Sequence, residues 1–254
     1  MISFLRKYRH KLLSENKLRK YLVYALGEII LVVIGILIAV SINNWQQQTI
    51  LKNKEQVYLK GLKEEFNTSK NKLDELIEAN RRNYQGSKTI LEYISNTGQL
   101  PTEKQFSELL FRSFSFDIAF NANNSLLNEM INSGSLKDIS NNQLRVLLTN
   151  WETTIKNVSG QEEKLAKQRE KVLDMFLTDK NSIRTIFEQI NLNSSMNLPK
   201  SKKNISNLNL LNSLEFENNI LMFFLTSTAM ETTYYKPLLK ELNTILKLIE
   251  VEIK

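Results

Sequence analysis

Residues 22–42 read LVYALGEIILVVIGILIAVSI, and this stretch decides the architecture of the chain. It holds a single charged side chain, Glu28, in 21 residues. As an α-helix it would be about 31 Å long, which matches the hydrocarbon core of a bilayer. Tyr24 at one end and Trp45 beyond the other are typical of membrane–water interfaces. The stretch therefore predicts one transmembrane helix, with its flanks, over residues 21–45.

The charge on the two sides of this span differs, which predicts its orientation. Residues 1–20 carry seven Lys or Arg and one Glu, whereas the lysines after the span are mixed with acidic residues. Because basic residues mark the cytoplasmic side, we expect a cytoplasmic N-terminus. In a bacterium, residues 46–254 would then lie in the periplasm, anchored in the inner (cytoplasmic) membrane by a single pass.

The net charge of +7 lies almost entirely in the tail of residues 1–20. A basic tail beside an apolar segment favours an anionic lipid bilayer as its partner, and no nucleic acid is expected. The tail is either a short amphipathic helix in the headgroup plane or a solvated basic segment. Its apolar face would consist of Phe4, Leu5, Tyr8 and Leu12.

A cleaved signal peptide is the alternative to a membrane anchor, since small residues occur at 39–41 after the apolar run. The run is longer than a usual signal sequence, and no helix-breaking residue follows Ser41. Both features favour a retained anchor.

One face of the predicted span suggests association between membrane helices. Glu28, Val32, Gly35 and Ala39 follow one another at helical spacing, and Gly35 with Ala39 forms a small-xxx-small pattern that allows close helix contact. This pattern predicts a homo-oligomer through the transmembrane helix. The alternative is that Glu28 has no role in association and its side chain only extends back to the aqueous interface.

The remainder of the chain has the composition of an all-α protein, because it is poor in glycine and proline and rich in helix-forming residues. Apolar residues at three-and-four spacing predict a long helix from the membrane to about Ser95, which residues 96–101 end. Together with two further long helices, it predicts an elongated antiparallel helical bundle over residues 46–254.

The central long helix shows the most regular heptad pattern in the sequence. Its stripe consists of Leu144, Leu148, Trp151, Ile155, Val158, Glu162, Leu165, Arg169, Val172 and Phe176. Glu162 and Arg169 interrupt it and form a possible polar layer of the bundle. They indicate either a buried ion pair with another helix or a binding site, or else they set the register or face solvent.

The last 40 residues resume an apolar stripe, which we expect to face the core. Its members are Leu214, Leu221, Leu225, Thr228, Thr232, Tyr235, Leu239, Leu242, Leu246, Ile249 and Ile253. Pro237 is expected to kink this helix. A short helix near residues 183–190 and a loop around Pro199 precede it.

Helix-capping residues are concentrated between Asn121 and Trp151. Asn123 and Asn124 are expected to open one short helix, Gly134 to end it, and Ser140 with Gln143 to form a capping box. Thr102 with Gln105 forms the same box earlier in the chain. These polar residues therefore indicate a structural elbow of the bundle and not a catalytic loop.

Two segments carry a resemblance to a known family. FLRKYRHKLLSENKLRKYLVYALGEIILVVIGILIAVSINNW (residues 4–45) and NANNSLLNEMINSGSLKDISNNQLRVLLTNW (residues 121–151) resemble an uncharacterised Bacteroidota family of single-span membrane proteins, the domain of unknown function 6090. The resemblance implies a membrane-anchored bacterial protein with a helical domain. It supplies no activity, ligand or catalytic residue.

The inventory of reactive side chains is small. The chain has no cysteine, its one histidine is His10 in the basic tail, and no glycine-rich phosphate loop occurs. We therefore expect no enzymatic activity, no catalytic or metal site and no cofactor. The predicted function is a non-catalytic scaffold or adaptor that binds an envelope protein or itself. The alternative is a sensor-like, ligand-binding helical bundle that signals through a partner, because the tail is too short for a signalling domain.

Overall fold

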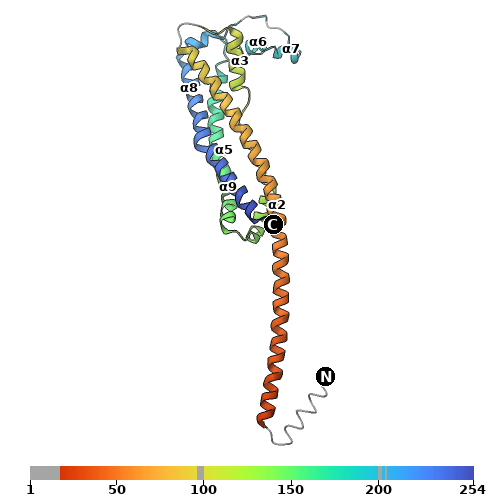
Figure 1. Ribbon diagram of the computed structural model, residues 1–254. Coiled ribbons are helices and arrows are strands. Elements are labelled where there is room, and N and C mark those ends of the chain that lie inside the picture. The colour runs from red at the N-terminus through yellow and green to blue at the C-terminus, as the bar shows by residue number, and fades with distance from the viewer. Residues whose placement is uncertain (1–17, 96–99, 200–201, 204) are drawn as a thin grey trace. The chain divides into compact units, whose positions relative to one another are not determined.

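The computed structural model describes residues 18–95, 100–199, 202–203 and 205–254. All regular elements within these residues are helices, which confirms the all-α prediction (Figure 1). The chain forms two compact units, one ending at Glu55 and one beginning at Gln56. Most of the predicted tail and the break at residues 96–99 lie outside the described residues. The predicted domain boundary at Gln46 rests on hydropathy and stays a prediction.

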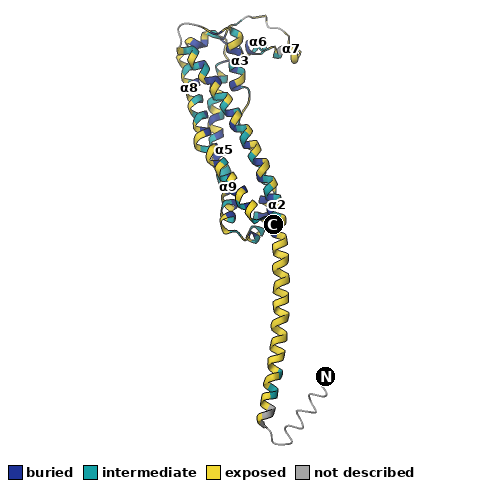
Figure 2. Ribbon diagram, viewed as in Figure 1, coloured by how far each residue is buried: buried dark blue, intermediate teal, exposed yellow. Residues whose placement is uncertain are grey.

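Helix α2, Leu18–Ser95, contains the apolar stretch and extends far beyond it. Every residue from Ile29 to Lys54 is exposed (Figure 2). From Ile29 to Ile42 the exposed side chains are almost all apolar, so they surround this part of the helix on all sides. The segment is long and apolar enough to cross a membrane, and a signal sequence would have the same character. The predicted end of the helix near Ser95 is confirmed.

The part of α2 in the second unit has a single buried stripe (Figure 2). Its buried residues recur mostly at three-and-four spacing, as expected for a helix that packs on one side. They are Leu59, Leu62, Phe66, Ser69, Leu73, Ile77, Asn80, Gly86, Ser87 and Ile90. The second half of α2 is therefore a core helix of the bundle.

Two further long helical segments complete the core of the second unit. They are α5, Asn142–Asp174, and a continuous segment of α8, Leu214–Ala229, η3, Met230–Tyr235, and α9, Lys236–Glu252. The Gln56 side chain donates to the Glu252 carbonyl (2.8 Å), and Asn80 donates to the Ser227 carbonyl (2.9 Å). Because the partner numbers fall as the α2 numbers rise, the last segment runs antiparallel to α2.

Short helices connect these long ones. They are α3, Glu103–Phe114, α4, Ser125–Asn132, η1, Ser135–Asp138, α6, Ile183–Gln189, α7, Leu192–Ser195, and η2, Leu208–Asn212. The predicted capping box of Thr102 and Gln105 opens α3. Gly134 follows α4 with a φ of 71°, a left-handed conformation that glycine adopts without strain, as predicted for a residue after a helix end.

The predicted capping box of Ser140 and Gln143 is wrong. Helix α5 begins at Asn142, and the side chain of Asn141 accepts a hydrogen bond from the Leu144 amide (2.9 Å). An asparagine accepts this bond as well as a serine does, so the cap residue is Asn141, one position after the predicted Ser140. Asn124 occupies the cap position of α4 but makes no side-chain capping bond.

The apolar stripe predicted for the last helix is wrong in its first half. Leu214, Leu221 and Leu225 are exposed, whereas the buried stripe consists of Phe216, Ile220, Phe223 and Ser227 of α8 and Met230 at the start of η3. The physical reason is the π-helical turn η3, which contains more residues per turn than an α-helix. The buried stripe steps five residues across it, from Met230 to Tyr235, and then continues through Leu238, Leu242, Ile245 and Ile249.

The π-turn immediately precedes Pro237, which lies in the first turn of α9. Proline lacks a backbone N–H, and its ring collides with the carbonyl four residues earlier in a regular α-helix. The wider turn at 230–235 avoids that collision. The irregularity expected at Pro237 is thus a change of helix type that moves the stripe by one residue.

Candidate functional site

The candidate association face of the membrane segment is open along α2. Gly35 and Ala39 are exposed and Glu28 is partly exposed. A Cβ added at Gly35 would meet no atom within 4 Å. The face is therefore sterically free for a second helix, and its role in association stays a prediction.

Glu162 lies in the buried layer between α5 and η3. One of its carboxylate oxygens accepts hydrogen bonds from the Tyr235 hydroxyl (2.7 Å) and from the Phe120 amide (2.9 Å). Burial raises the pKa of Glu162, and the two hydrogen bonds oppose this only in part. Both partners are neutral, so Glu162 does not form the ion pair that the sequence pattern offered as one possibility. It links three segments of the bundle.

A second buried carboxylate, Glu231, lies in the same π-turn. It accepts bonds from Arg81 (2.7 Å) and Tyr84 (3.0 Å) of α2, and Lys236 lies 3.2 Å away. Burial favours a higher pKa, but the hydrogen bonds from Arg81, Tyr84 and Lys236 outweigh it, so the pKa of Glu231 is lowered. This cluster joins α2 to the turn that carries Tyr235.

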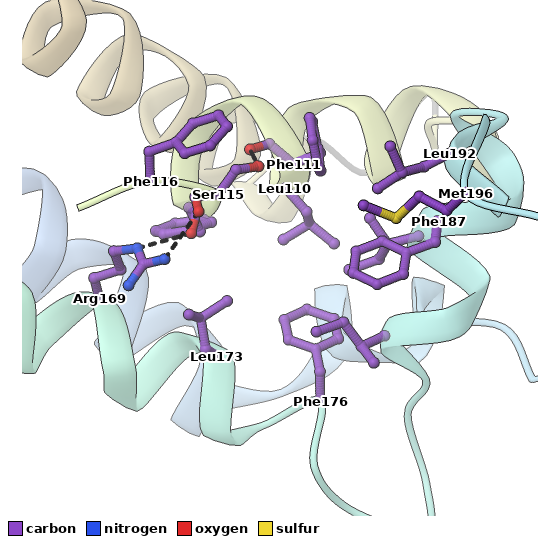
Figure 3. A pocket seen from close by; sticks show the side chains of 13 residues that line it. Leu110, Phe111, Ser115, Phe116, Arg169, Leu173, Phe176, Phe187, Leu192 and Met196 are labelled. Atoms are coloured by element: carbon purple, nitrogen blue, oxygen red, sulfur yellow. Dashed lines mark hydrogen bonds between the residues drawn. The ribbon is translucent and has the colours of Figure 1, made fainter. Parts of the chain in front are cut away.

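Arg169 does not meet Glu162, although both lie on one stripe of α5. Its guanidinium donates to the Phe114 and Ser115 carbonyls (2.8 and 3.1 Å) and pairs with Asp117 (2.7 Å). The carbonyls at the end of α3 need such donors, because a helix C-terminus has no intrahelical partner for them. Arg169 thus fixes the end of α3 on α5, beside an apolar cavity (Figure 3).

The predicted elbow between Asn121 and Trp151 is held by side chains of α2. The Glu65 carboxylate accepts from the Leu126 and Leu127 amides (2.6 and 3.2 Å), which lie at the start of α4. Ser69 exchanges hydrogen bonds with the backbone of Asn123. A helix start is thus capped by a residue about 60 positions away in the sequence, and the elbow stays a structural prediction.

The outward side of α8 carries exposed apolar residues. We call Leu214, Asn218, Leu221, Met222 and Leu225 the outer seam. Met222 is 49% and Leu225 57% exposed, whereas the adjacent Phe223 is 1% exposed. The one charged residue from 218 to 233 is Glu231, which is buried. A solvated helix face normally carries charges, so this uncharged apolar seam is a candidate interaction surface of the second unit.

Several of these groups have no clear sequence signal. The apolar stripe predicts Tyr235 as a core residue, but its bond to Glu162 depends on the π-turn. Arg81, Glu231 and Glu65 resemble the many other charged residues of the helices. Only their partners on distant elements distinguish them.

Comparison with known proteins assigns the family. The family of unknown function DUF6090 matches residues 28–156, just over half of the chain. This range begins inside the apolar segment and ends within α5. No curated protein and no solved structure matches the chain. The chain belongs to the family of unknown function DUF6090.

Proposed function

We propose that this protein is a non-catalytic scaffold of the bacterial envelope that associates with a second copy of itself through the outer seam of α8. Residues 21–45 anchor it in the inner membrane by a single pass. Residues 1–20 are cytoplasmic and contact anionic lipid, and residues 46–254 are periplasmic. The observation that carries the proposal is that α8 is apolar on two opposite faces, only one of which is buried within the described residues.

Retention of the anchor is supported by the continuity of α2. The helix passes without interruption through residues 39–41, where a signal peptide would be cut, and ends only at Ser95. Signal peptides combine a short apolar region with a small-residue cleavage site, and here the apolar region is longer and the helix continues unbroken past the small residues. The complete exposure of the apolar side chains from Ile29 onward also suits a lipid environment.

A second copy fits the outer seam better than an unrelated globular partner does. Leu214, Asn218, Leu221 and Leu225 follow the four-three-four spacing of a coiled-coil seam. A homotypic contact about a two-fold axis places each residue near its own equivalent, so a charged seam would repel itself. This seam has no charge.

Anchoring also favours a parallel arrangement. Two copies inserted in one membrane with the same orientation are related by an axis along the membrane normal, so equivalent helices run in the same direction. In a parallel pair, Asn218 of one copy would face Asn218 of the other. A single asparagine at such a position specifies register and a two-stranded state.

Disulfide crosslinking in native membranes tests this function, because the chain has no cysteine of its own. Leu221→Cys and Leu225→Cys should each give a crosslinked dimer under mild oxidation, since seam positions approach within disulfide range. Lys156→Cys, on the exposed side of α5, is the matched control and should stay monomeric. Equal crosslinking at all three positions, or none at the seam, would contradict self-association through α8.

Two further variants separate the two contact regions. Leu225→Lys should abolish crosslinking at position 221, because it places two like charges against one another. Gly35→Leu tests the predicted contribution of the membrane helix and should weaken the crosslink without abolishing it. If a photoreactive residue at position 225 instead captures a different envelope protein, the adaptor form of the function replaces the self-associating one.

A further inference from the structure

An apolar cavity lies within the second unit, among α3, α5, α6 and α7 (Figure 3). Its volume is about 360 Å³, and eleven of its thirteen lining residues are apolar. Phe111 of α3, Leu173 of α5 and Phe187 of α6 contribute to three different walls. Pockets of this size are large enough for a small organic ligand.

Both polar side chains of the wall, Ser115 and Arg169, make hydrogen bonds within the protein. The Ser115 hydroxyl donates to the Phe111 carbonyl. Arg169 uses its Nε and both terminal nitrogens on Phe114, Ser115 and Asp117. A water molecule needs two to four polar partners, and the remaining wall offers it hydrocarbon. The cavity is therefore suited to an apolar occupant.

Two residues of the cavity wall are also strongly exposed. Phe116 is 76% exposed and Met196 is 60% exposed, and they lie at opposite ends of the cavity in Figure 3. Large exposed apolar side chains at the edge of an apolar cavity mark a ligand or lipid contact more often than a solvated surface. A hydrocarbon chain could enter the cavity beside Phe116 or Met196 without bringing a polar group of the protein into an apolar medium.

We infer that the cavity binds one hydrocarbon chain of a fatty-acyl type. A cavity of about 150 Å³ accommodates benzene, so this one suits a chain of about 10 to 14 heavy atoms. The polar end of the chain lies at the Arg169 end, where the guanidinium has two N–H groups beyond the three bonds described. The inference is independent of self-association through α8, because the cavity and the outer seam share no residue.

Methyl NMR of the full chain in lipid nanodiscs tests this site, since Met196 lines the cavity. The probes are decanoate and decanol, with the methionine methyl groups ¹³C-labelled and the Met196 signal assigned by Met196→Leu. Either probe should shift the Met196 signal saturably and leave Met130 and Met230 in place, since both are buried elsewhere. A larger effect of decanoate indicates a free acid held by Arg169; equal effects indicate that the chain alone is recognised.

A matched pair of variants distinguishes binding from general partitioning. Leu173→Trp fills the cavity and should remove the saturable shift, with unchanged Met130 and Met230 signals as evidence of folding. Leu177→Trp adds the same side chain at an exposed position and should leave binding intact. A linear, non-saturating shift, or a saturable one that persists in Leu173→Trp, would overturn the proposal.

Discussion

Helices α5 and α8 pack against each other in the second unit, yet they distribute their apolar residues in opposite ways. In α5, the buried apolar residues form one stripe, and the rest of the surface is mostly polar, with Val146 as an exposed apolar residue. In α8, Phe216 and Phe223 face inward while Leu221 and Leu225 face outward. A single stripe allows one way of packing, whereas two stripes leave the choice to the rest of the fold. Periodicity therefore determined the buried face of α5 but not that of α8.

The π-turn η3 explains why the buried face of α8 is not the one that regular three-and-four spacing predicts. Counting backward from Tyr235 in steps of three and four leads to Leu225 and Leu221, on the outer seam. The extra residue in the turn instead connects Tyr235 to Met230 and Phe223. Turns of this type occur frequently at functional sites. This one carries the buried carboxylate Glu231 and also Tyr235, which donates a hydrogen bond to the buried carboxylate Glu162.

The largest expected effect tests which face of α8 is buried. Phe223→Ala should lower the free energy of unfolding by about 3–5 kcal/mol, because it removes a buried ring and leaves a cavity. Met222→Ala, one residue away, should change it by less than about 0.5 kcal/mol. Urea unfolding of the full chain in detergent micelles, followed by circular dichroism, measures both. A larger loss for Met222→Ala would reverse the assigned faces.

The next effect concerns the polar layer that connects α5 with the π-turn. Glu162→Ala leaves the Tyr235 hydroxyl and the Phe120 amide without their acceptor, at a cost of about 1–3 kcal/mol for each buried group. Glu162→Gln keeps one acceptor oxygen and should recover part of the loss. Glu163→Ala is the exposed control on the same helix. Equal melting temperatures for the Glu162 and Glu163 alanine variants would show that this layer is not structural.

A smaller effect is expected where α2 caps α4. Glu65→Ala removes the acceptor for the Leu126 and Leu127 amides and should cost about 0.5–2 kcal/mol, the range of a helix cap. Glu64→Ala, on the exposed side of α2, should be close to neutral. Hydrogen exchange of the Leu126 and Leu127 amides gives a local readout, and unchanged protection in Glu65→Ala would refute the cap.

The smallest effect is a difference in pH dependence between the two buried carboxylates. The pKa of Glu162 in the folded chain is raised above its ordinary value of 4.5, so the unfolded chain loses this proton first. The stability that Glu162 contributes therefore falls as pH rises from 4.5 through the folded pKa. The pKa of Glu231 is lowered, so its contribution is present above 4.5 and is lost as pH falls through the folded pKa. Relative to the wild type, Glu162→Gln should gain stability with rising pH and Glu231→Gln should lose it.

Melting temperatures of the three proteins between about pH 3 and pH 8 measure these slopes, a range that covers the titration of carboxyl groups. Opposite slopes would show that the two carboxylates differ in their surroundings as described. Parallel slopes would mean that neither burial nor the Arg81 contact controls their titration.

The sequence by itself determined the helical class, the apolar segment of residues 22–42, the extent of α2 and the stripe of α5. Each of these depends on local composition or on an uninterrupted period, so neighbouring residues contain the information. It also located Gly134 and the capping box of Thr102, because turn and cap preferences are local.

Only the tertiary structure decided which face of α8 is buried, that Asn141 and Glu65 provide caps, and that Glu162 meets Tyr235. These features join positions far apart in the chain or depend on one extra residue in a helical turn. A change of one residue rotates every side chain beyond it by about 100°, and the preference for a π-turn is too weak to be read from composition. The packing of α2 and α5 against the last segment stabilises that turn, and this packing leaves the outer seam exposed.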